Sequence, residues 1–439
     1  MEIKHWAATD VGRKRSHNED NFLIDKNLNL FVVADGMGGH ASGEVASAIA
    51  VHTIRDVVFT ERDLLGSADV DGTGQMELVA LLEYAVHSAS ARIFHKAQQE
   101  PEKRGMGTTV VALLTIGARG FIAYVGDSRI YLSRNGVVYP LTEDHSLMNE
   151  LIRSGKVRAD EFAVSPYANF KNAMTRAVGV YEHVEVDILD FEILPGDAFL
   201  LCSDGLYDYL DDAEIASNLA LSNIEEIPGR FIDLANSRGG KDNITALVVQ
   251  VSHDESSASR AAQLSFTVDA LRRIPLMDQL SYQQLVKIMN IARMQPCRVG
   301  EVLCREGTPG GDLYAVLEGA VTLSRGDLAA RRDVPVLDGE LQAVDRDGLF
   351  LVGEITARSL IRGATEQGSA VAATIAQAAF GDRFDEVAAQ TVDRDRPVVE
   401  AQRTVGVLCM TQRGREIGVL DDAPLAVHLH RGHAVVAPD

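Results

Sequence analysis

The sequence has few cysteines, no long apolar run and a shortage of positive charge, and each of these excludes a class of protein. Its four cysteines are scattered and form no CxxC pair: Cys202, Cys297, Cys304 and Cys409. They are therefore interpreted as reduced thiols rather than as disulfides or zinc ligands. No apolar stretch approaches the length of a membrane span, and the start of the chain lacks the apolar segment of a signal peptide. We expect a soluble, cytoplasmic protein.

The charge balance and the missing motifs exclude further functions. Lys and Arg number 42 against 63 Asp and Glu, which gives a formal net charge of −21. Binding to nucleic acid or to an anionic membrane requires a basic surface, so we expect neither as a partner. The sequence also lacks GxSxG and GxxxxGK[ST], the motifs of a serine-hydrolase elbow and of a phosphate-binding loop.

The length of 439 residues favours two domains. Residues 1–252 alternate strand-like runs with segments of helical spacing at 42–58, 76–99 and 211–223. This order predicts an α+β fold in which sheets are sandwiched between helices, rather than a doubly wound parallel sheet. Residues 253–265 are polar and rich in small side chains, which predicts a linker.

The second half of the chain has a different pattern. Residues 266–295 show helical spacing, and residues 297–327 alternate apolar and polar side chains with glycines at the turns, as in a small β-barrel. Beyond residue 327 the chain contains no Lys, Asn or Tyr and is dominated by Ala, Val, Arg, Asp and Gly. Residues 327–439 are interpreted as a diverged segment, a disordered one, or one translated in a shifted reading frame.

Acidic residues lie where strand-like runs start or end. Four of them are Asp35, Asp127, Asp204 and Asp242, and Glu19 and Asp20 form a further pair near the start of the chain. A buried strand that stops at an acid presents its carboxylate at the sheet edge, where water can reach. Like charges that share a site cannot all stay ionised unless cations accompany them. Because hard oxygen ligands favour Mg, Mn or Ca, the sequence predicts a site for several metal ions.

Arg15 precedes Glu19 by four residues and Asp20 by five. Such an arginine can neutralise surplus carboxylate or hold a substrate phosphate through its two parallel N–H groups. The alternative is a solvated basic turn, because Arg13 and Lys14 are adjacent. Divalent ions with one arginine suit hydrolysis of a phosphoester by a metal-activated water.

Seven short motifs occur in the order seen in metal-dependent protein phosphatases of the PPM (type 2C) family, bacterial branch. They are NED, ADGMGGH, GTT, VGDSR, TRAVG, CSDG and GGKDNIT, and they span residues 1–252. On these motifs the first domain resembles that family. The resemblance implies a central β-sandwich flanked by helices in α-β-β-α layers, with Mn²⁺ or Mg²⁺ in a cleft at one end. It also implies phosphorylated proteins as substrates, and a Ser/Thr kinase as the enzyme that phosphorylates them.

The same resemblance implies ligands for the first ion. Asp35 would bridge two ions, and the backbone carbonyl of Gly36 would complete one of them. Asp204 and Asp242 would hold the first ion. Some family members carry a histidine directly after the bridging Asp-Gly as general acid, but this chain has Met37 there. The source of the leaving group's proton is therefore left open.

The remaining site residues follow from the same resemblance. Glu19 and Asp20 would act around the second ion, largely through ordered waters. Asp127 would help to bind a third, looser ion, and Arg15 would bind the phosphoryl group. Residues 143–179 would form a mobile flap beside the cleft that contributes to substrate choice.

Three histidines, His17, His145 and His183, are interpreted as surface or network residues rather than as metal ligands. Cys202, within the run FLLCSDG, is interpreted as core packing.

Residues 266–326 resemble the N-terminal half of a cyclic-nucleotide-binding domain. The similarity rests on Gly300-Glu301, Gly307, Asp312-Leu313-Tyr314 and Gly319, where glycines would allow tight corners between short strands. The half that would hold the nucleotide is not recognisable. Gly353-Glu354 and Phe380-Gly381 are only partial matches, without an arginine at the expected distance. A cyclic nucleotide is therefore one candidate ligand. Two alternatives stay open: a phosphoprotein-binding module with weak or no catalysis, and a regulator whose main task is sensing a cyclic nucleotide, with phosphatase activity as its output.

Overall fold

The computed structural model describes most of the first 298 residues and six strands beyond them. The described residues are 2–38, 42–67, 73–158, 160–170, 173–252, 258–274, 277 and 280–298, with strands at 302–304, 312–318, 321–324, 351–352, 398–401 and 405–411. The chain divides into two compact units, Met1–Ala261 and Ala262–Asp439. Within the described residues, no helix combines the length and the apolar character needed to span a bilayer.

The first unit contains two antiparallel sheets. One has the strand order β2-β3-β5-β6-β9, with a short strand β4 paired to the end of β3. Its strands are β2 (Asp20–Asp25), β3 (Leu30–Met37), β4 (Gly107–Thr108), β5 (Val110–Ile116), β6 (Arg119–Val125) and β9 (Asp187–Glu192). Strands β3, β5 and β6 are buried along nearly their whole length, because both faces of this sheet are covered.

The other sheet has the order β1-β11-β10-β7-β8. Its strands are β1 (Ile3–Asp10), β7 (Arg129–Arg134), β8 (Val137–Pro140), β10 (Ala198–Cys202) and β11 (Ile244–Val251). The rings of Phe191 on β9 and Phe199 on β10 lie 5.8 Å apart between their centroids. The two sheets therefore pack face to face and share an aromatic core.

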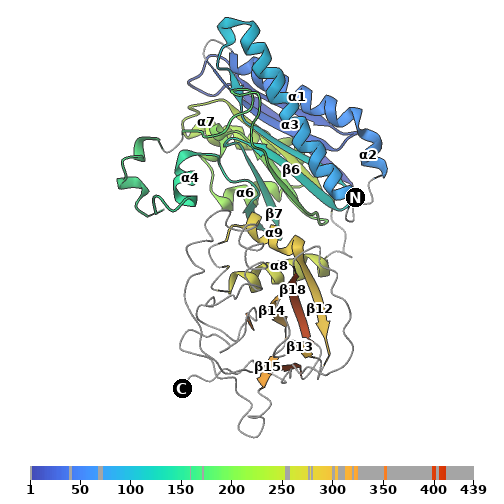
Figure 1. Ribbon diagram of the computed structural model, residues 1–439. Helices are drawn as coiled ribbons and strands as arrows, with labels where there is room; N and C mark the ends of the chain where they lie inside the picture. The colour runs from blue at the N-terminus through green and yellow to red at the C-terminus, as the bar shows by residue number, and fades with distance from the viewer. Residues whose placement is uncertain are drawn as a thin grey trace. The chain divides into compact units, whose positions relative to one another are not determined.

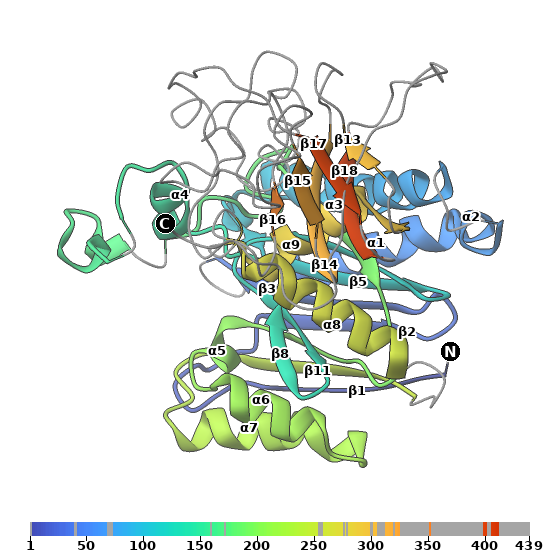
Figure 2. The ribbon, with the colours of Figure 1, turned by 90° about the horizontal axis from the view of Figure 1, so that it is seen from below.

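Helices cover the outer face of each sheet (Figures 1 and 2). On one side lie α1 (Ser42–Thr60), α2 (Arg62–Ser67) and α3 (Thr73–Gln99), with an apolar core between them and the six-stranded sheet. On the other side lie α5 (Asp204–Tyr207), α6 (Asp212–Leu219) and α7 (Ile227–Ser237), with a second core against the five-stranded sheet. This confirms the predicted α-β-β-α layers for the first domain.

The remaining segments of this unit are short. Helix α4 (Leu147–Arg153) opens the segment predicted as a flap, and 3-10 turns occupy Pro101–Lys103, Phe162–Val164, Ala168–Phe170 and Ile224–Glu226. The apolar run at residues 22–35 folds as the hairpin of β2 and β3, with Asn29 in the left-handed region at φ 51°. Asparagine tolerates that conformation better than other side chains do.

Helix α8 (Ala258–Arg272) begins in the last residues of the first unit and continues into the second, which also contains α9 (Tyr282–Ile291). Helix α8 begins within the predicted linker, so residues 258–265 are helical. Residues 292–295 were predicted to be helical, but they belong to strand β12 (Ala292–Cys297), which pairs with β18 (Val405–Thr411).

Its strands form two small sheets. Their orders are β12-β18-β14-β16 and β13-β17-β15. The further strands are β13 (Val302–Cys304), β14 (Asp312–Glu318), β15 (Val321–Ser324), β16 (Leu351–Val352) and β17 (Val398–Ala401). Three strands from beyond residue 327 thus pair with strands that precede it. Gly300, Gly307, Gly319, Gly353-Glu354 and Phe380-Gly381 lie outside the described residues, and the predicted similarity to a cyclic-nucleotide-binding domain stays a prediction.

Candidate active site

The predicted acidic residues come together at one end of the two sheets. Asp20 and Asp35 are direct partners in the ladder between β2 and β3. Asp204 begins α5 two residues after β10 ends, and Asp242 lies two residues before β11, the neighbouring strand. Asp127 lies two residues after the end of β6. Five carboxylates from separate parts of the sequence therefore share one region.

The electrostatics show that these carboxylates are close to one another and poorly solvated. Burial raises the pKa of Asp35 well above its usual range, and the charges of Asp20, Asp204, Asp127 and Asp242 raise it further. Burial is also the main cause that raises the pKa of Asp20 and of Asp204 to about 6, and that of Asp127 to about 7. The cluster resists full ionisation near neutral pH, so a bound cation would stabilise its charged form.

Two oxygens of the cluster are buried without a hydrogen-bond partner. Asp20, only 5% exposed, accepts hydrogen bonds at Oδ2 from Ser203 Oγ and Thr245 Oγ1, each at 2.7 Å. Its Oδ1 has no partner, and neither has Oδ1 of Asp204. Buried polar atoms are normally paired, so two unpaired carboxylate oxygens in one cluster mark positions for a ligand. Oxygen donors of this kind suit Mn²⁺ or Mg²⁺.

Glu19 and Gly36 are fixed by contacts with the start of α1. The Glu19 carbonyl accepts hydrogen bonds from Gly36 N–H at 3.1 Å and from Ser47 Oγ at 2.6 Å, while its Oε1 accepts one from Gly43 N–H at 3.2 Å. A Cβ at position 36 would lie 2.1 Å from the Gly43 carbonyl oxygen. Only glycine therefore lets the helix pack directly against the end of β3, beside Asp35.

Arg15 contacts the acidic cluster. Its Nη2 lies 2.6 Å from Asp242 Oδ2, and 48% of its side chain is exposed. Burial acts to lower the pKa of Arg15, but the neighbouring charges of Asp242, Glu19 and Asp35 outweigh it and raise that pKa. The guanidinium therefore lies against the carboxylates with one side open to solvent.

Protein side chains alone do not enclose a single ion here. Among the described residues, no three acidic, histidine or cysteine side chains converge as a complete set of ligands. Water would fill the remaining positions, as it commonly does around Mg²⁺. Met37 ends β3 and carries a thioether, which has no proton to give to a leaving group.

Sequence reasoning missed the hydroxyl residues that support the acids. Besides Ser203 and Thr245, Thr109 accepts a hydrogen bond from Asp35 N–H at 3.0 Å and lies 2.7 Å from Ser128, oxygen to oxygen. These residues belong to the motifs CSDG, DNIT, GTT and GDSR, so the sequence motifs that contain the acids also contain the hydroxyl residues. The hydrogen bonds between these hydroxyls and the acids could not be predicted from the sequence, because they depend on how the two sheets face each other.

A sandwich of two sheets that carries buried, mutually close carboxylates at one end defines a hydrolase of the metal-dependent phosphatase type. A family model described as protein phosphatase 2C matches residues 11–236. The serine/threonine phosphatase stp of Listeria innocua is 40% identical over 246 residues, which cover 55% of this chain and 93% of the relative. The chain therefore belongs to the protein phosphatase 2C family, and it is an enzyme of the protein phosphatase class.

Solved structures show the same similarity. One, a bacterial serine phosphatase, is 31% identical with a TM-score of 0.50, over 58% of this chain and all of that chain. The catalytic domain of PstP in complex with two manganese ions is 34% identical, with a TM-score of 0.46 over 57% of this chain and 98% of that chain.

Proposed function

We propose that this protein removes phosphate from phosphoserine and phosphothreonine in proteins, with two or three Mn²⁺ or Mg²⁺ ions in the acidic cluster. One observation carries the proposal: Asp20, Asp35 and Asp204 are close, poorly solvated carboxylates, and two of their oxygens have no partner. The choice of phosphoserine and phosphothreonine is supported by relatives named serine/threonine phosphatases, such as that of Listeria innocua.

Each acidic residue of the cluster would have its own role in metal binding. Asp35 lies among the other aspartates and would be shared between two ions, with the Gly36 carbonyl beside it. Asp204 and Asp242 would hold the first ion, and Glu19 and Asp20 would surround the second. Asp127 would help to hold a third. Bound ions would supply positive charge for the phosphoryl oxygens and lower the pKa of the attacking water.

Arg15 would exchange its ion pair with a carboxylate for an ion pair with the substrate phosphate. In this structure its guanidinium is paired with Asp242, which would become a metal ligand. Once Asp242 is engaged by an ion, Arg15 is free to hold two phosphoryl oxygens through its parallel N–H groups. Its half-exposed position leaves it within reach of an incoming phosphate.

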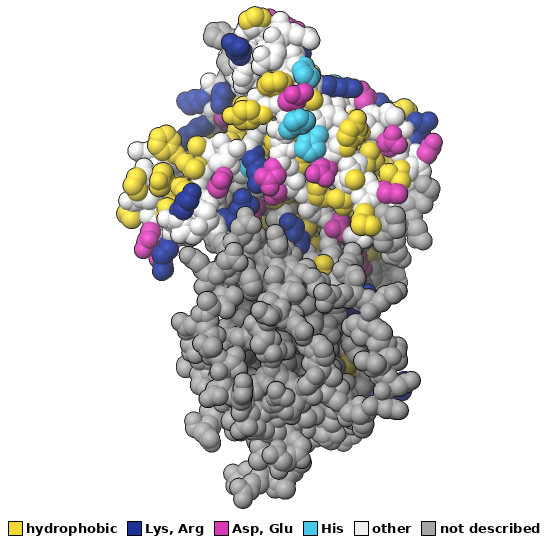
Figure 3. All heavy atoms as spheres, viewed as in Figure 1, with side chains coloured by type: hydrophobic (Ala, Val, Ile, Leu, Met, Phe, Trp, Pro, Cys, Tyr) yellow, Lys and Arg dark blue, Asp and Glu magenta, His cyan; other side chains and the backbone are white. Residues whose placement is uncertain are grey.

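The flap would contact the polypeptide around the phosphorylated residue. Val164 is 86% exposed and Phe170 58%, with Tyr167 also exposed between them. Figure 3 shows hydrophobic side chains gathered on the lobe formed by this segment. Apolar side chains on an exposed segment suit contact with a substrate protein rather than with a small phosphate ester. Substrates phosphorylated by a Ser/Thr kinase are part of the proposal.

The second unit would regulate the enzyme. This part of the proposal is supported by the sequence similarity of residues 266–326 to a cyclic-nucleotide-binding domain. A ligand of the native state raises the melting temperature, so cyclic AMP or cyclic GMP should do so if either binds. An unchanged melting temperature at saturating nucleotide would remove the sensing role and leave the phosphatase proposal intact.

The test of the main proposal is release of phosphate from a phosphothreonine peptide. Turnover should require Mn²⁺ or Mg²⁺, stop with excess EDTA, and exceed turnover of the matched phosphotyrosine peptide. Asp204→Asn should abolish it, because a ligand of the first ion is lost. A folded, Mn²⁺-loaded protein that binds the phosphopeptide without turnover would instead support the phosphoprotein-binding module.

A further inference from the structure

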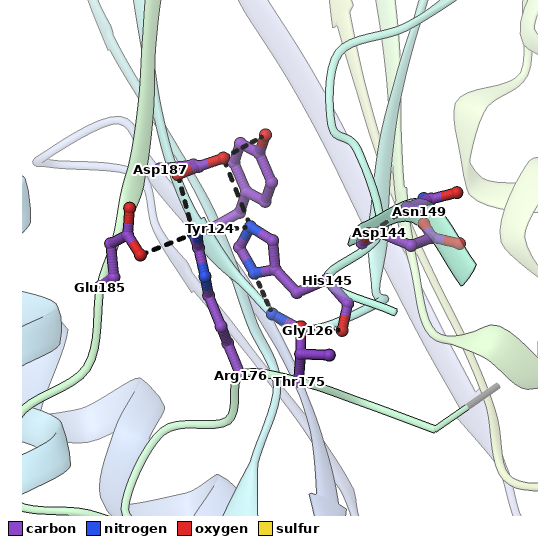
Figure 4. A network of polar contacts seen from close by, with 9 residues as sticks. All are labelled: Tyr124, Gly126, Asp144, His145, Asn149, Thr175, Arg176, Glu185 and Asp187. Carbon is purple, nitrogen blue, oxygen red and sulfur yellow. Dashed lines mark hydrogen bonds and ion pairs between the residues drawn. The ribbon is translucent and has the colours of Figure 1, made fainter. Parts of the chain in front are cut away.

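A buried histidine, His145, forms hydrogen bonds with both the N–H and the carbonyl of Gly126, the residue that precedes Asp127. The His145 backbone N–H donates to the Gly126 carbonyl at 2.9 Å, and the ring Nδ1 accepts from the Gly126 N–H at 3.0 Å (Figure 4). Both peptide groups of this glycine are thus held by one residue of another segment. The orientation of the turn that carries Asp127 depends on His145.

The ring of His145 is fixed in one tautomer. Because Nδ1 accepts a hydrogen bond from Gly126, the neutral ring carries its proton on Nε2, which donates to Asp187 Oδ2 at 3.3 Å. Arg176 Nη1 lies 3.4 Å from the same Nε2 and, with the proton there, is a neighbour of that nitrogen rather than its donor. The Tyr124 hydroxyl donates to the same Asp187 oxygen at 3.1 Å, and its ring is stacked on the imidazole with 5.2 Å between centroids. Arg176 pairs with Asp187 at 3.1 Å and with Glu185 at 2.8 Å. The imidazole is therefore held by its neighbours and has little freedom to rotate.

Both ends of the described flap meet at His145. Its carbonyl accepts hydrogen bonds from Thr175 N–H at 2.8 Å and Thr175 Oγ1 at 3.2 Å. The next residue, Ser146, caps the first turn of α4 and forms a β-bridge with Met174. The chain between Ser146 and Met174 is thus closed at its base by contacts of His145 and its neighbour, so a movement of this segment would act on His145 directly.

The turn that carries Asp127 is restricted in its conformation by further contacts. Gly126 has φ +106°, and a Cβ there would lie 2.7 Å from Thr109 Cγ2. After the turn, Arg129 forms a bidentate pair with Asp144 at 2.9 and 2.8 Å, again in the segment that leads into the flap. Without an acceptor at His145, the buried Gly126 N–H would have no partner, and the turn would rotate to satisfy it.

We propose that His145 is a positioning residue: through the Gly126 amide it orients the Asp127 carboxylate toward the acidic cluster and links that orientation to the flap. This rests on the proposed function, in which Asp127 helps to bind the third and weakest ion. Residues that support metal ligands commonly affect affinity by about 10–100-fold.

Two substitutions test the roles of the two ring nitrogens separately. In His145→Asn, the amide oxygen takes the place of Nδ1 and can still accept from Gly126 N–H. In His145→Gln, the amide nitrogen takes the place of Nε2, and the acceptor is lost. Calorimetric titration of the metal-free full chain with Mn²⁺ should show the weakest site about 10–100-fold weaker in His145→Gln, and near wild-type in His145→Asn. Equal losses in both variants would overturn the proposal.

A double-mutant cycle tests whether the effect passes through Asp127. Asp127→Ala should weaken the same site, and adding His145→Gln should cause no further loss, because coupled residues are not additive. A further full loss in the double variant would overturn the proposal. His183→Gln, at an exposed histidine, is the matched control and should bind Mn²⁺ as the wild type does.

A direct measurement needs no variant and no turnover. Nitrogen-15 shifts of the wild-type imidazole should show Nδ1 unprotonated and Nε2 protonated, and a ring protonated on Nδ1 alone would overturn the proposal. Thermal melting identifies a variant that fails to fold. A wild-type protein that binds Mn²⁺ but hydrolyses no phosphopeptide would contradict the proposed function, while the titrations would still decide the role of His145.

Discussion

Asp20 on β2 lies directly opposite Asp35 on β3, so two poorly solvated carboxylates face each other on the same side of the ladder. Like charges at directly opposite positions destabilise a pair of antiparallel strands. Within the described part of the chain, no lysine or arginine forms an ion pair with either of them, and Arg15 is bonded to Asp242. The folded protein therefore contains a repulsion that a cation can relieve.

The first prediction concerns Asp20→Asn. The amide oxygen can still accept from Ser203 and Thr245, while the charge opposite Asp35 is removed. In EDTA the variant should melt a few degrees higher than the wild type, since about 1 kcal/mol corresponds to roughly 2–4 °C in a domain of this size. With Mn²⁺ its gain in melting temperature should be smaller than that of the wild type. Asp160→Asn, at an exposed acid outside the cluster, serves as the control. A lower melting temperature in EDTA would contradict the repulsion.

The second prediction is the pH dependence of the metal-free protein. Folding raises the pKa of Asp20 and Asp204 to about 6 and that of Asp127 to about 7, from unfolded values near 4. The folded state thus binds these protons more tightly, and the stability they contribute is lost as pH rises from about 4 through 7. In EDTA, the contribution of these acids should lower the melting temperature as the pH rises over this range. Comparison of the wild type with Asp204→Asn isolates the contribution of Asp204.

The same acids predict a pH effect of opposite sign on metal binding. Protons compete with Mn²⁺ for the carboxylates, so Mn²⁺ affinity should rise between pH 5.5 and pH 7.5. The rise in melting temperature that Mn²⁺ causes should grow over the same range. An Mn²⁺ affinity independent of pH would mean that these carboxylates are not the ligands.

The third prediction separates the two roles of Arg15. Its ion pair with Asp242 is half exposed, and such pairs contribute little to stability, so Arg15→Ala should leave the melting temperature nearly unchanged. If Arg15 holds the phosphoryl group, kcat/KM on the phosphopeptide should fall by about 10–100-fold, because hydrogen bonds to charged groups contribute about 1.5–3 kcal/mol. Most of the change should appear in KM. Arg13→Ala is the control, and an unchanged kcat/KM in Arg15→Ala would leave only the neutralising role.

The fourth prediction compares two glycines. At Gly36 a Cβ would lie 2.1 Å from the Gly43 carbonyl oxygen, whereas at Gly229 in α7 a Cβ would meet no atom within 4 Å. Gly36→Ala should destabilise the protein by at least about 1–3 kcal/mol, the range for overpacking. Gly229→Ala should stabilise it by about 0.5–1 kcal/mol, because glycine is unfavourable inside a helix. Urea denaturation of both variants gives the comparison.

The layered fold was predictable because apolar runs and helical spacings were strong over residues 1–252. Helix α7 was missed: its preceding residue, Glu226, makes no side-chain cap, and Pro228 in its first turn is a weaker start signal because proline is also common in loops. Strand β12 was predicted as helix because no glycine or proline separates it from α9. Its pairing with β18, more than a hundred residues later in the chain, decides its conformation.

The acids of the site were predictable one by one, because each stands near the start or the end of a strand-like run. Their supporting hydroxyls were not. Ser203 and Thr245 reach Asp20 from the five-stranded sheet, while Asp20 itself lies in the six-stranded sheet. That contact exists only once the sheets are packed, and no spacing within one strand reveals it.

The two hydroxyls on Asp20 also bear on which cation the cluster can accept. Because Ser203 and Thr245 both occupy Oδ2, Asp20 has a single oxygen left to offer, and it can bind an ion only through that atom. Calcium takes about six to eight oxygens and often uses both atoms of a carboxylate, whereas magnesium takes a regular octahedron with several waters. Under the proposed function, the two hydroxyls would therefore favour the smaller ion by limiting Asp20 to one oxygen, although they contact only its other oxygen.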